Sequence, residues 1–145
     1  KAKGSLYKGG VHVPLIVSGY GVSRQGEEEE ALVTAVDFYN TFLAAANLSP
    51  EENLDSQSFW PLVASTGEGA RTVNYAEVTG DRPNRSGYTL FDGRYKWLVL
   101  DNGNERFYDL SNDAGENTNL LNGTLSDEAE NALNVLRAKA EEIRQ

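Results

Sequence analysis

The stretch Tyr88–Leu120 reads YTLFDGRYKWLVLDNGNERFYDLSNDAGENTNL and decides the fold expected for this chain. Its apolar residues are mostly aromatic or branched and fall in short runs, a composition that suits half-buried strands. They are Tyr88, Leu90, Tyr95, Trp97, Leu98, Val99, Leu100, Phe107, Tyr108 and Leu110. Asp92-Gly93 and Asn102-Gly103 separate these runs and carry the residue types that tight hairpin turns need. Spacing alone therefore predicts an antiparallel meander and says nothing about chemistry.

Size and composition indicate one ordered domain. A chain of 145 residues can bury roughly two-thirds of its unfolded surface. Its hydrophobic fraction of 39% and its 4 prolines argue against disorder. No apolar run approaches the ~20 residues that a membrane-spanning helix needs, and no signal peptide is visible at the start.

The charge and the missing cysteines exclude several classes of function. A net charge of −9 disfavours nucleic acid, because phosphate binding needs clustered Lys and Arg. It also disfavours an anionic substrate unless local cations overcome the field. The absence of cysteine removes disulfides, thiolate zinc sites and cysteine nucleophiles from these residues. We expect no nucleic-acid partner and no membrane partner, and the compartment stays open.

Two segments of the first half suit burial in a larger α/β layer. Val11–Ser18 is almost continuously apolar, which predicts a strand buried on both faces. No other segment reads as its parallel partner, so we expect its neighbours outside this chain, which also begins at Lys1 without Met. Leu32–Leu48 carries apolar residues at three- and four-residue steps, which predicts a helix with Thr34 or Asp37 as N-cap. Any exposed apolar patch should lie on these two segments.

The second half is expected to form a separate small layer. Ser65–Ala70 (STGEGA) reads as a linker, so we place residues 1–64 in one domain and residues 71–145 in another. Arg71–Val78 should be the first strand of the sheet. Ser126 should cap a final helix that lies across the sheet. Its apolar stripe is Ala129, Leu133, Leu136, Ala140 and Ile143. The predicted fold class is α+β.

Three runs of the opening stretch resemble the C-terminal region of sulfatases, which belong to the alkaline phosphatase superfamily. Gly93–Leu98 (GRYKWL), Glu105–Leu110 (ERFYDL) and Asn112–Leu120 (NDAGENTNL) correspond to the family patterns dGryKli, ELYDL and DPxExxNL. The chain departs from them at Trp97, Phe107 and Ala114, where the family has an aliphatic residue, Leu and Pro. The resemblance marks the family's architecture rather than its chemistry. It implies that residues 1–64 end a catalytic α/β domain and that residues 71–145 form an antiparallel-sheet subdomain.

The N-terminal segment carries the single candidate site residue, Lys3. Lys3–Val17 is similar to the family pattern KgtlyEGGvrVPlivr, with Lys8 for Glu and His12 for Arg. In the family, the lysine at the position of Lys3 contacts a sulfate oxygen in the active site. The resemblance implies this role for Lys3, whose ammonium would offset charge that develops as the S–O bond breaks. The alternative is a solvated surface lysine.

Two further segments match the family with one notable exchange each. Val36–Leu43 resembles vDlxPTLL, with Asn40 in place of Pro. This exchange is mild, because Pro is tolerated in a first helical turn. Leu54–Leu62 resembles lDGxSLlPLL, with Ser56 in place of Gly. Ser56 would strain the turn if the position needed a positive φ.

Most of the family's catalytic parts are absent from these residues. Sulfatases use a formylglycine nucleophile matured within Cys/Ser-x-Pro-x-Arg, a calcium ion held by Asp and Asn residues, two histidines and two lysines. Asp81–Arg85 has the Pro-x-Arg half, but Asp81 cannot become formylglycine, so we interpret this run as a loop. His12, the lone histidine, stands where the family has Arg. The resemblance therefore implies calcium and formylglycine in the intact enzyme and neither cofactor in this chain.

Three functions stay open. The first is the C-terminal portion of a sulfatase, which supplies Lys3 and a wall of the cleft for a sulfate ester, is completed by a missing N-terminal part, and is inactive alone. The second is a piece of a related phosphonate or phosphodiester hydrolase. The third is a non-catalytic binding or scaffold module. An upstream Cys/Ser-x-Pro-x-Arg would favour the first, for which the family implies a periplasmic or secreted location.

Overall fold

The computed structural model describes residues 3–65 and 67–145, which form two compact units. The sheet unit combines the residues up to Pro14 with Tyr75–Gln145, and the middle unit is Leu15–Asn74. The first described residues thus pack with the C-terminal half of the chain. The assignment of residues 1–64 and 71–145 to two parts of a sulfatase stays a prediction.

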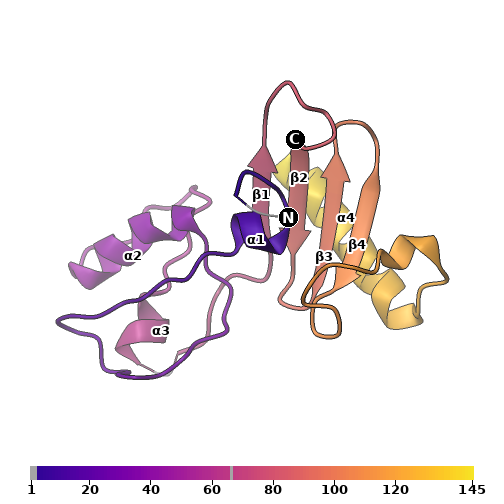
Figure 1. The fold of residues 1–145 in the computed structure, drawn as a ribbon. Coiled ribbons are helices and arrows are strands. Elements are labelled where there is room, and N and C mark those ends of the chain that lie inside the picture. The colour runs from indigo at the N-terminus through magenta and orange to yellow at the C-terminus, as the bar shows by residue number, and fades with distance from the viewer. Residues whose placement is uncertain (1–2, 66) are drawn as a thin grey trace. The chain divides into compact units, whose positions relative to one another are not determined.

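The sheet unit is built on a four-stranded meander. Its strands are β1 (Asn74–Val78), β2 (Gly87–Phe91), β3 (Tyr95–Leu100) and β4 (Glu105–Asp109). They lie in the order β1-β2-β3-β4, and β3 pairs antiparallel with both β2 and β4 (Figure 1). This confirms the antiparallel sheet predicted within residues 71–110.

Both predicted turns are present. At the first, Gly93 has a φ of +102° and the Asp92 N–H donates to the Tyr95 carbonyl over 3.1 Å. At the second, Gly103 has a φ of +83° and the Leu100 N–H donates to the Asn104 carbonyl over 2.9 Å. Glycine adopts these positive φ angles without a Cβ penalty, so the hairpin at Asn102-Gly103 is confirmed.

A long C-terminal helix covers one face of the sheet. Helix α4 (Asp127–Ile143) begins after Ser126, whose hydroxyl accepts the Ala129 N–H. Its predicted apolar stripe is buried apart from Ile143, which is 41% exposed at the end of the helix. α4 contacts β2 and β3, and it lies behind the sheet in Figure 1. The prediction that the final helix packs on the sheet is confirmed.

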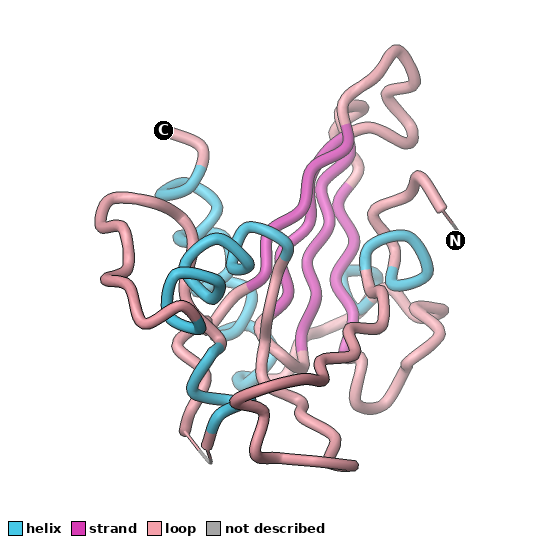
Figure 2. Tube along the Cα trace, turned by 90° about the vertical axis from the view of Figure 1, so that its left-hand side faces the viewer, coloured by secondary structure: helices cyan, strands magenta, loops and turns pink. Residues whose placement is uncertain are grey.

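The N-terminal segment covers the opposite face. Along β3, Tyr95, Trp97 and Val99 alternate with Lys96, Leu98 and Leu100, so the two sets face opposite sides. Leu6 forms a buried cluster with Leu98 and Leu100. Figure 2 shows the sheet edge-on, with the N-terminal segment on one side and the C-terminal helix on the other. The sheet is therefore sandwiched between the two ends of the described chain.

The strand predicted at Val11–Ser18 is wrong. Residues Lys8–Val11 form a short helix, α1, and residues 12–18 belong to no strand. A strand buried on both faces needs hydrogen-bonded neighbours, and no described strand pairs with these residues. Their side chains are exposed instead, with Ile16 at 91%.

The middle unit contains the predicted helix in a shorter form. The 3₁₀ turn η1 (Ala35–Asp37) leads into α2 (Phe38–Ala45), and the short helix α3 (Trp60–Ala64) follows. Thr34 is the N-cap of η1, and its backbone N–H donates to the Asp37 carboxylate over 2.9 Å. The apolar stripe faces outward, with Tyr39 52% and Phe42 65% exposed.

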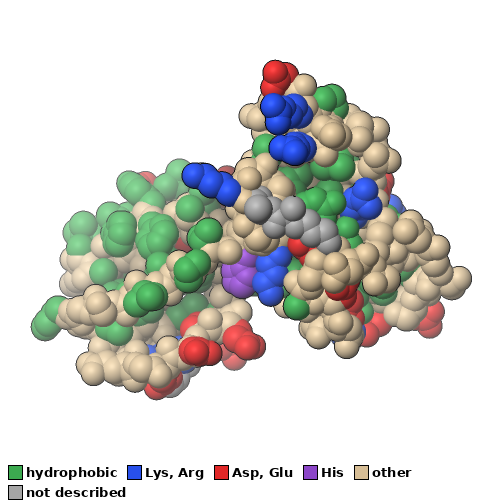
Figure 3. All heavy atoms as spheres, in the orientation of Figure 1, with side chains coloured by type: hydrophobic (Ala, Val, Ile, Leu, Met, Phe, Trp, Pro, Cys, Tyr) green, Lys and Arg blue, Asp and Glu red, His purple; other side chains and the backbone are tan. Residues whose placement is uncertain are grey.

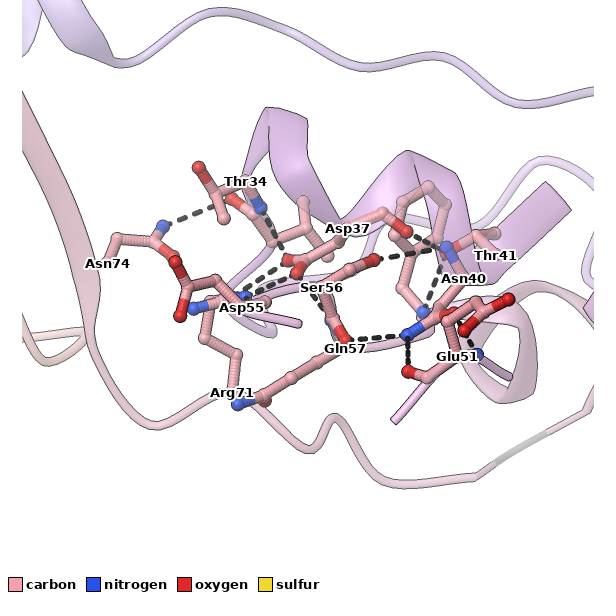
Figure 4. Close-up of polar contacts among 12 residues, drawn as sticks. Thr34, Asp37, Asn40, Thr41, Glu51, Asp55, Ser56, Gln57, Arg71 and Asn74 are labelled. Atoms are coloured by element: carbon pink, nitrogen blue, oxygen red, sulfur yellow. Dashed lines mark hydrogen bonds and ion pairs between the residues drawn. The ribbon is translucent and has the colours of Figure 1, made fainter. Parts of the chain in front are cut away.

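Buried polar side chains share the interior of the middle unit with Phe59 and Leu62. Asp37, Asn40, Thr41 and Ser56 are all at most 9% exposed. Asp37 accepts hydrogen bonds from Arg71 and from the Gln57 N–H, and Thr41 accepts the Phe59 N–H (Figure 4). Each buried polar group named here has a partner, which is the condition for burying it without a large free-energy cost.

Ser56 fits its position without the strain considered above. It is not among the described residues with positive φ, and its hydroxyl accepts the Asn40 N–H over 3.0 Å. The Asn40 side chain donates to the Ser56 and Glu51 carbonyls.

The sheet unit also contains the 3₁₀ turn η2 (Leu120–Asn122), which precedes α4. No helix in the described chain is both long and apolar enough to cross a bilayer.

Substitution of Gly87 should destabilise the sheet unit more than substitution of Gly103. At Gly87 (φ +140°) a Cβ would lie 2.0 Å from the Val99 carbonyl oxygen, whereas at Gly103 (φ +83°) nothing lies within 4 Å. We expect Gly87→Ala to lower the free energy of unfolding by about 3 kcal/mol or more. Gly103→Ala should cost about 1–2 kcal/mol. Urea unfolding of both variants checks this, and equal losses would contradict it.

The chain by itself should self-associate through the outward apolar side chains of the middle unit. Ile16, Tyr39 and Phe42 are 91%, 52% and 65% exposed, and exposed apolar surface promotes association. Light scattering over a concentration series should show a rising mean mass. The variant Ile16→Ser/Phe42→Ser should reduce that rise. A strict monomer at high concentration would disprove the expectation.

Candidate functional site

Lys3 lies exposed at the start of a segment that is anchored close by. Gly4 follows it with a φ of +76°, and Leu6 is only 1% exposed, packed against Leu98 and Leu100. Figure 3 shows several Lys and Arg side chains on the face that carries the N-terminus. The Lys3 side chain is therefore accessible to solvent, three residues before Leu6, which is held in the core.

Glu116 holds the next part of the segment. Its two carboxylate oxygens accept the Lys8 backbone N–H over 3.0 and 2.9 Å. Lys8 is the first residue of α1, whose early N–H groups lack intrahelical partners, and a carboxylate there also meets the positive end of the helix dipole. The contact uses main-chain atoms of Lys8, so it does not depend on that residue's side chain.

Lys96 neutralises the same carboxylate from the sheet. Its Nζ lies 2.7 Å from Glu116 Oε1, and both side chains are only 2% exposed. Burial lowers the pKa of Lys96, and the hydrogen bond and charge of Glu116 oppose that shift. Removing one partner of a buried pair typically costs about 3–5 kcal/mol, because the other charge is left uncompensated.

Aromatic contact adds to this face. The rings of Tyr7 and Tyr108 lie 6.3 Å apart between centroids. Burial raises the pKa of the Tyr108 hydroxyl above its ordinary value, and Tyr7 adds to the shift. Three consecutive residues, Leu6, Tyr7 and Lys8, thus each contact the sheet unit's second face or its loop.

The loop that carries Glu116 is fixed at both ends. Asp113 accepts the backbone N–H groups of Asn117 and Thr118, each over 2.7 Å. The Asn119 side chain accepts the Phe107 N–H over 2.9 Å, which ties the loop to β4. The resemblance marked this run as architecture, and the structure gives its polar residues contacts that aim Glu116 at α1.

Sequence reasoning selected Lys3 and missed Lys96 and Glu116. The signal for Lys96 was available, because a lysine inside the run YKWLVL is unusual for a buried strand and calls for a buried anion. Glu116 gave a weaker signal. It stands in a loop, and only the fold brings it to Lys96, 20 residues away in sequence.

The other sequence features form no catalytic cluster. His12 is exposed, and residues 81–85 lie in the turn between β1 and β2, as interpreted. Among the described residues, no group of three or more His, Cys, Asp or Glu side chains could hold a metal ion. The described donor set therefore does not fit a calcium site, and no described serine stands in a Cys/Ser-x-Pro-x-Arg motif that could mature to formylglycine.

Comparison with known proteins identifies a family for nearly the whole chain. A family model described as "N-sulphoglucosamine sulphohydrolase, C-terminal" matches residues 2–145. Arylsulfatase K of Gallus gallus is 34% identical over 128 residues, and that of Xenopus laevis is 32% identical over 129 residues. Each match covers 81% of this chain but only 24% of the relative.

Solved structures share the fold. A putative sulfatase from Bacteroides thetaiotaomicron has a TM-score of 0.79 and 22% identity, covering 95% of this chain and 30% of its own. A protein solved with its substrate D-glucosamine-2-N,6-O-disulfate has a TM-score of 0.60 and 21% identity, covering 74% and 23%. The phosphonate monoester hydrolase of Agrobacterium radiobacter has a TM-score of 0.50 and 20% identity, with the same coverage.

Acid should destabilise the sheet unit in part through Asp109. The hydrogen bond from the Arg94 guanidinium lowers the pKa of Asp109, burial opposes this, and Asn112 adds to the lowering. A folded pKa below the unfolded value near 3.9 stabilises the native state above that value, and the contribution is lost as pH falls through the folded pKa.

Urea midpoints at about pH 6 and about pH 3 measure this loss. We expect the wild type to lose more stability between them than Asp109→Asn does. Asp101→Asn, at an exposed carboxylate of the hairpin turn, serves as the control and should keep the wild-type dependence. An identical acid dependence in Asp109→Asn would refute the assignment.

Proposed function

The chain belongs to the family of N-sulphoglucosamine sulphohydrolase C-terminal domains, and on that premise we propose that the protein it completes hydrolyses sulfate esters with Lys3 in contact with the sulfate. The chain is the C-terminal portion of a sulfatase and spans 24% of the length of its curated relatives. Nucleophile and metal ligands would therefore come from residues outside this chain.

The observation that carries the proposal is the way in which the segment from Lys3 to Lys8 is anchored. Lys3 is exposed, while Leu6 is buried and the Lys8 N–H is held by Glu116. A solvated surface lysine gains nothing from such anchoring. A lysine that must meet a sulfate oxygen does, because a preorganised cation stabilises developing charge without reorganisation during the reaction.

The role of this chain in the chemistry is limited to charge. When the S–O bond breaks, negative charge grows on the leaving oxygen and stays on the sulfate oxygens. The Lys3 ammonium can donate a hydrogen bond to one of these oxygens and so offset that charge. Calcium and formylglycine, which the family resemblance implies, would act from residues elsewhere in the longer protein. The same resemblance favours a periplasmic or secreted enzyme.

A phosphonate or phosphodiester hydrolase is the second candidate. The fold likeness to a phosphonate monoester hydrolase supports it, with a TM-score of 0.50. Identities to arylsulfatase K above 30% favour sulfur over phosphorus. A purely non-catalytic module is the third candidate, and the same assay separates all three.

In the intact enzyme, Lys3→Ala should lower turnover of an aryl sulfate by about 10²-fold or more, the scale for losing one transition-state donor. The isolated chain should show no turnover, because it lacks a nucleophile. Lys139→Ala, a change at a partly exposed lysine of α4, is the matched control and should leave the rate unchanged. The assay is repeated with an aryl phosphonate, with calcium present throughout.

The outcomes separate the candidates. Turnover of the sulfate with loss in Lys3→Ala supports the proposal. Preference for the phosphonate selects the second candidate, and an intact protein inactive on both selects the non-catalytic one. An unchanged rate in Lys3→Ala would remove the role given to Lys3, as would hydrolysis by the isolated chain.

A further inference from the structure

We infer that Glu116 is a positioning residue for Lys3, held in place by Lys96: it fixes, through the Lys8 backbone, the segment that presents the Lys3 ammonium. This inference rests on the proposed function, since it concerns the same lysine. It assigns part of the active-site geometry to a loop that contributes no reacting group. The inference rests on the backbone conformation of Glu116, on the groups that its carboxylate contacts and on the position of Lys96 in an interior strand.

The backbone of Glu116 is held in an unfavourable conformation. Its φ is +54°, in the left-handed region that residues with a Cβ rarely adopt. Such a conformation persists only where surrounding contacts determine it. Here the Asp113 carboxylate accepts hydrogen bonds from the backbone N–H groups of Asn117 and Thr118. The Glu116 N–H donates to the Asp113 backbone carbonyl over 3.0 Å. The loop therefore holds a backbone geometry that directs the carboxylate inward.

Both carboxylate oxygens of Glu116 are used on the segment that follows Lys3. They accept the single Lys8 N–H at 3.0 and 2.9 Å, and Oε1 also accepts from Lys96. Glu116 is 3% exposed, so water does not compete for these oxygens. Loss of the charge would leave the first N–H of α1 poorly satisfied and would free the segment to move.

Lys96 supplies a rigid reference for this contact. It lies in β3, an interior strand of the sheet, opposite Tyr108 of β4. Ladder hydrogen bonds on both sides restrict the backbone of such a strand. Its buried ammonium pairs with the Glu116 carboxylate and holds it in place. Through Glu116, α1 is thus attached to an interior strand of the sheet.

Lys3 is close enough in sequence to depend on this contact. Four residues separate Lys3 from Lys8, and one of them, Leu6, is buried. A shift of Leu6 reaches Lys3 across three peptide bonds, and a shift at Lys8, the start of α1, reaches it across five. A misplacement of about 1 Å can cost about 10²-fold in rate. Lys8 stands where the family has Glu. This exchange leaves the contact with Glu116 intact, because only the backbone N–H of Lys8 takes part in it.

The test is a double-mutant cycle in the intact enzyme with kcat and KM measured on an aryl sulfate. The variants are Lys3→Ala, Glu116→Gln and the two combined, assayed well below their unfolding temperatures and normalised to folded protein. Glu116→Gln alone should lower kcat by about 10-fold or more. In the Lys3→Ala background it should change kcat less than twofold, because residues that act as a unit are non-additive.

Leu136→Ala is the control for stability. Leu136 is fully buried in α4 on the opposite face of the sheet, so the change opens a cavity without touching Glu116. It should leave kcat per folded molecule unchanged. Hydrogen exchange should show faster exchange at residues 8–12 in Glu116→Gln and wild-type exchange there in Leu136→Ala. If Glu116→Gln does not fold, the neutral pair Lys96→Met/Glu116→Gln replaces it, and Leu136→Val replaces an unfolded Leu136→Ala.

Each outcome decides between the claims. Loss of kcat in Glu116→Gln that vanishes in the Lys3→Ala background supports the positioning role. An equal loss in both backgrounds, or no loss at all, overturns it while Lys3→Ala still confirms the proposed function. A loss of kcat in Leu136→Ala as large as in Glu116→Gln also overturns it, because stability alone would then explain the effect. No change in Lys3→Ala overturns the role proposed for Lys3 and, with it, the positioning role of Glu116.

Discussion

The buried ion pair between Lys96 and Glu116 is the interaction on which the second face of the sheet depends. Both side chains are only 2% exposed, and neither charge would be tolerated there without the other. The pair joins an interior strand, the loop after β4 and the helix α1, which are distant in sequence. A hydrophobic pair could give comparable stability, but it could not accept the Lys8 N–H. The ion pair therefore fixes the position of α1 through the Lys8 N–H, which an apolar pair in the same place could not do.

The sheet unit could be predicted from sequence because its signals are local. Asn102-Gly103 specifies its own turn, Ser126 its own cap, and period-two alternation the faces of β3. Val11–Ser18 failed for the opposite reason: its apolar run was interpreted as a strand, but a strand is defined by its neighbours. Lys3 was found only through the family resemblance. Glu116 was missed because its role needs a contact with Lys8, 108 residues away in sequence.

The middle unit shows how two departures from a family pattern can be complementary. Asn40 stands where the family has Pro and so brings a backbone N–H that Pro lacks. Ser56 stands where the family has Gly and brings a hydroxyl, which accepts that N–H over 3.0 Å. Either exchange alone would be less favourable, since a buried N–H without an acceptor costs roughly 1–3 kcal/mol. Sequence analysis treated the two positions separately, and only their contact explains them together.

The same unit turns part of the apolar face of a helix outward. Its helix α2 turns Asn40 and Thr41 inward and leaves Phe42 65% exposed. Its interior combines the buried apolar side chains Phe59 and Leu62 with the hydrogen-bonded side chains Asp37 and Asn40. The sheet unit is built in the usual way, with apolar layers on both faces. The sheet unit can serve as the rigid reference for Lys3 because its apolar core and the buried Lys96–Glu116 pair both fix the segment that carries the lysine.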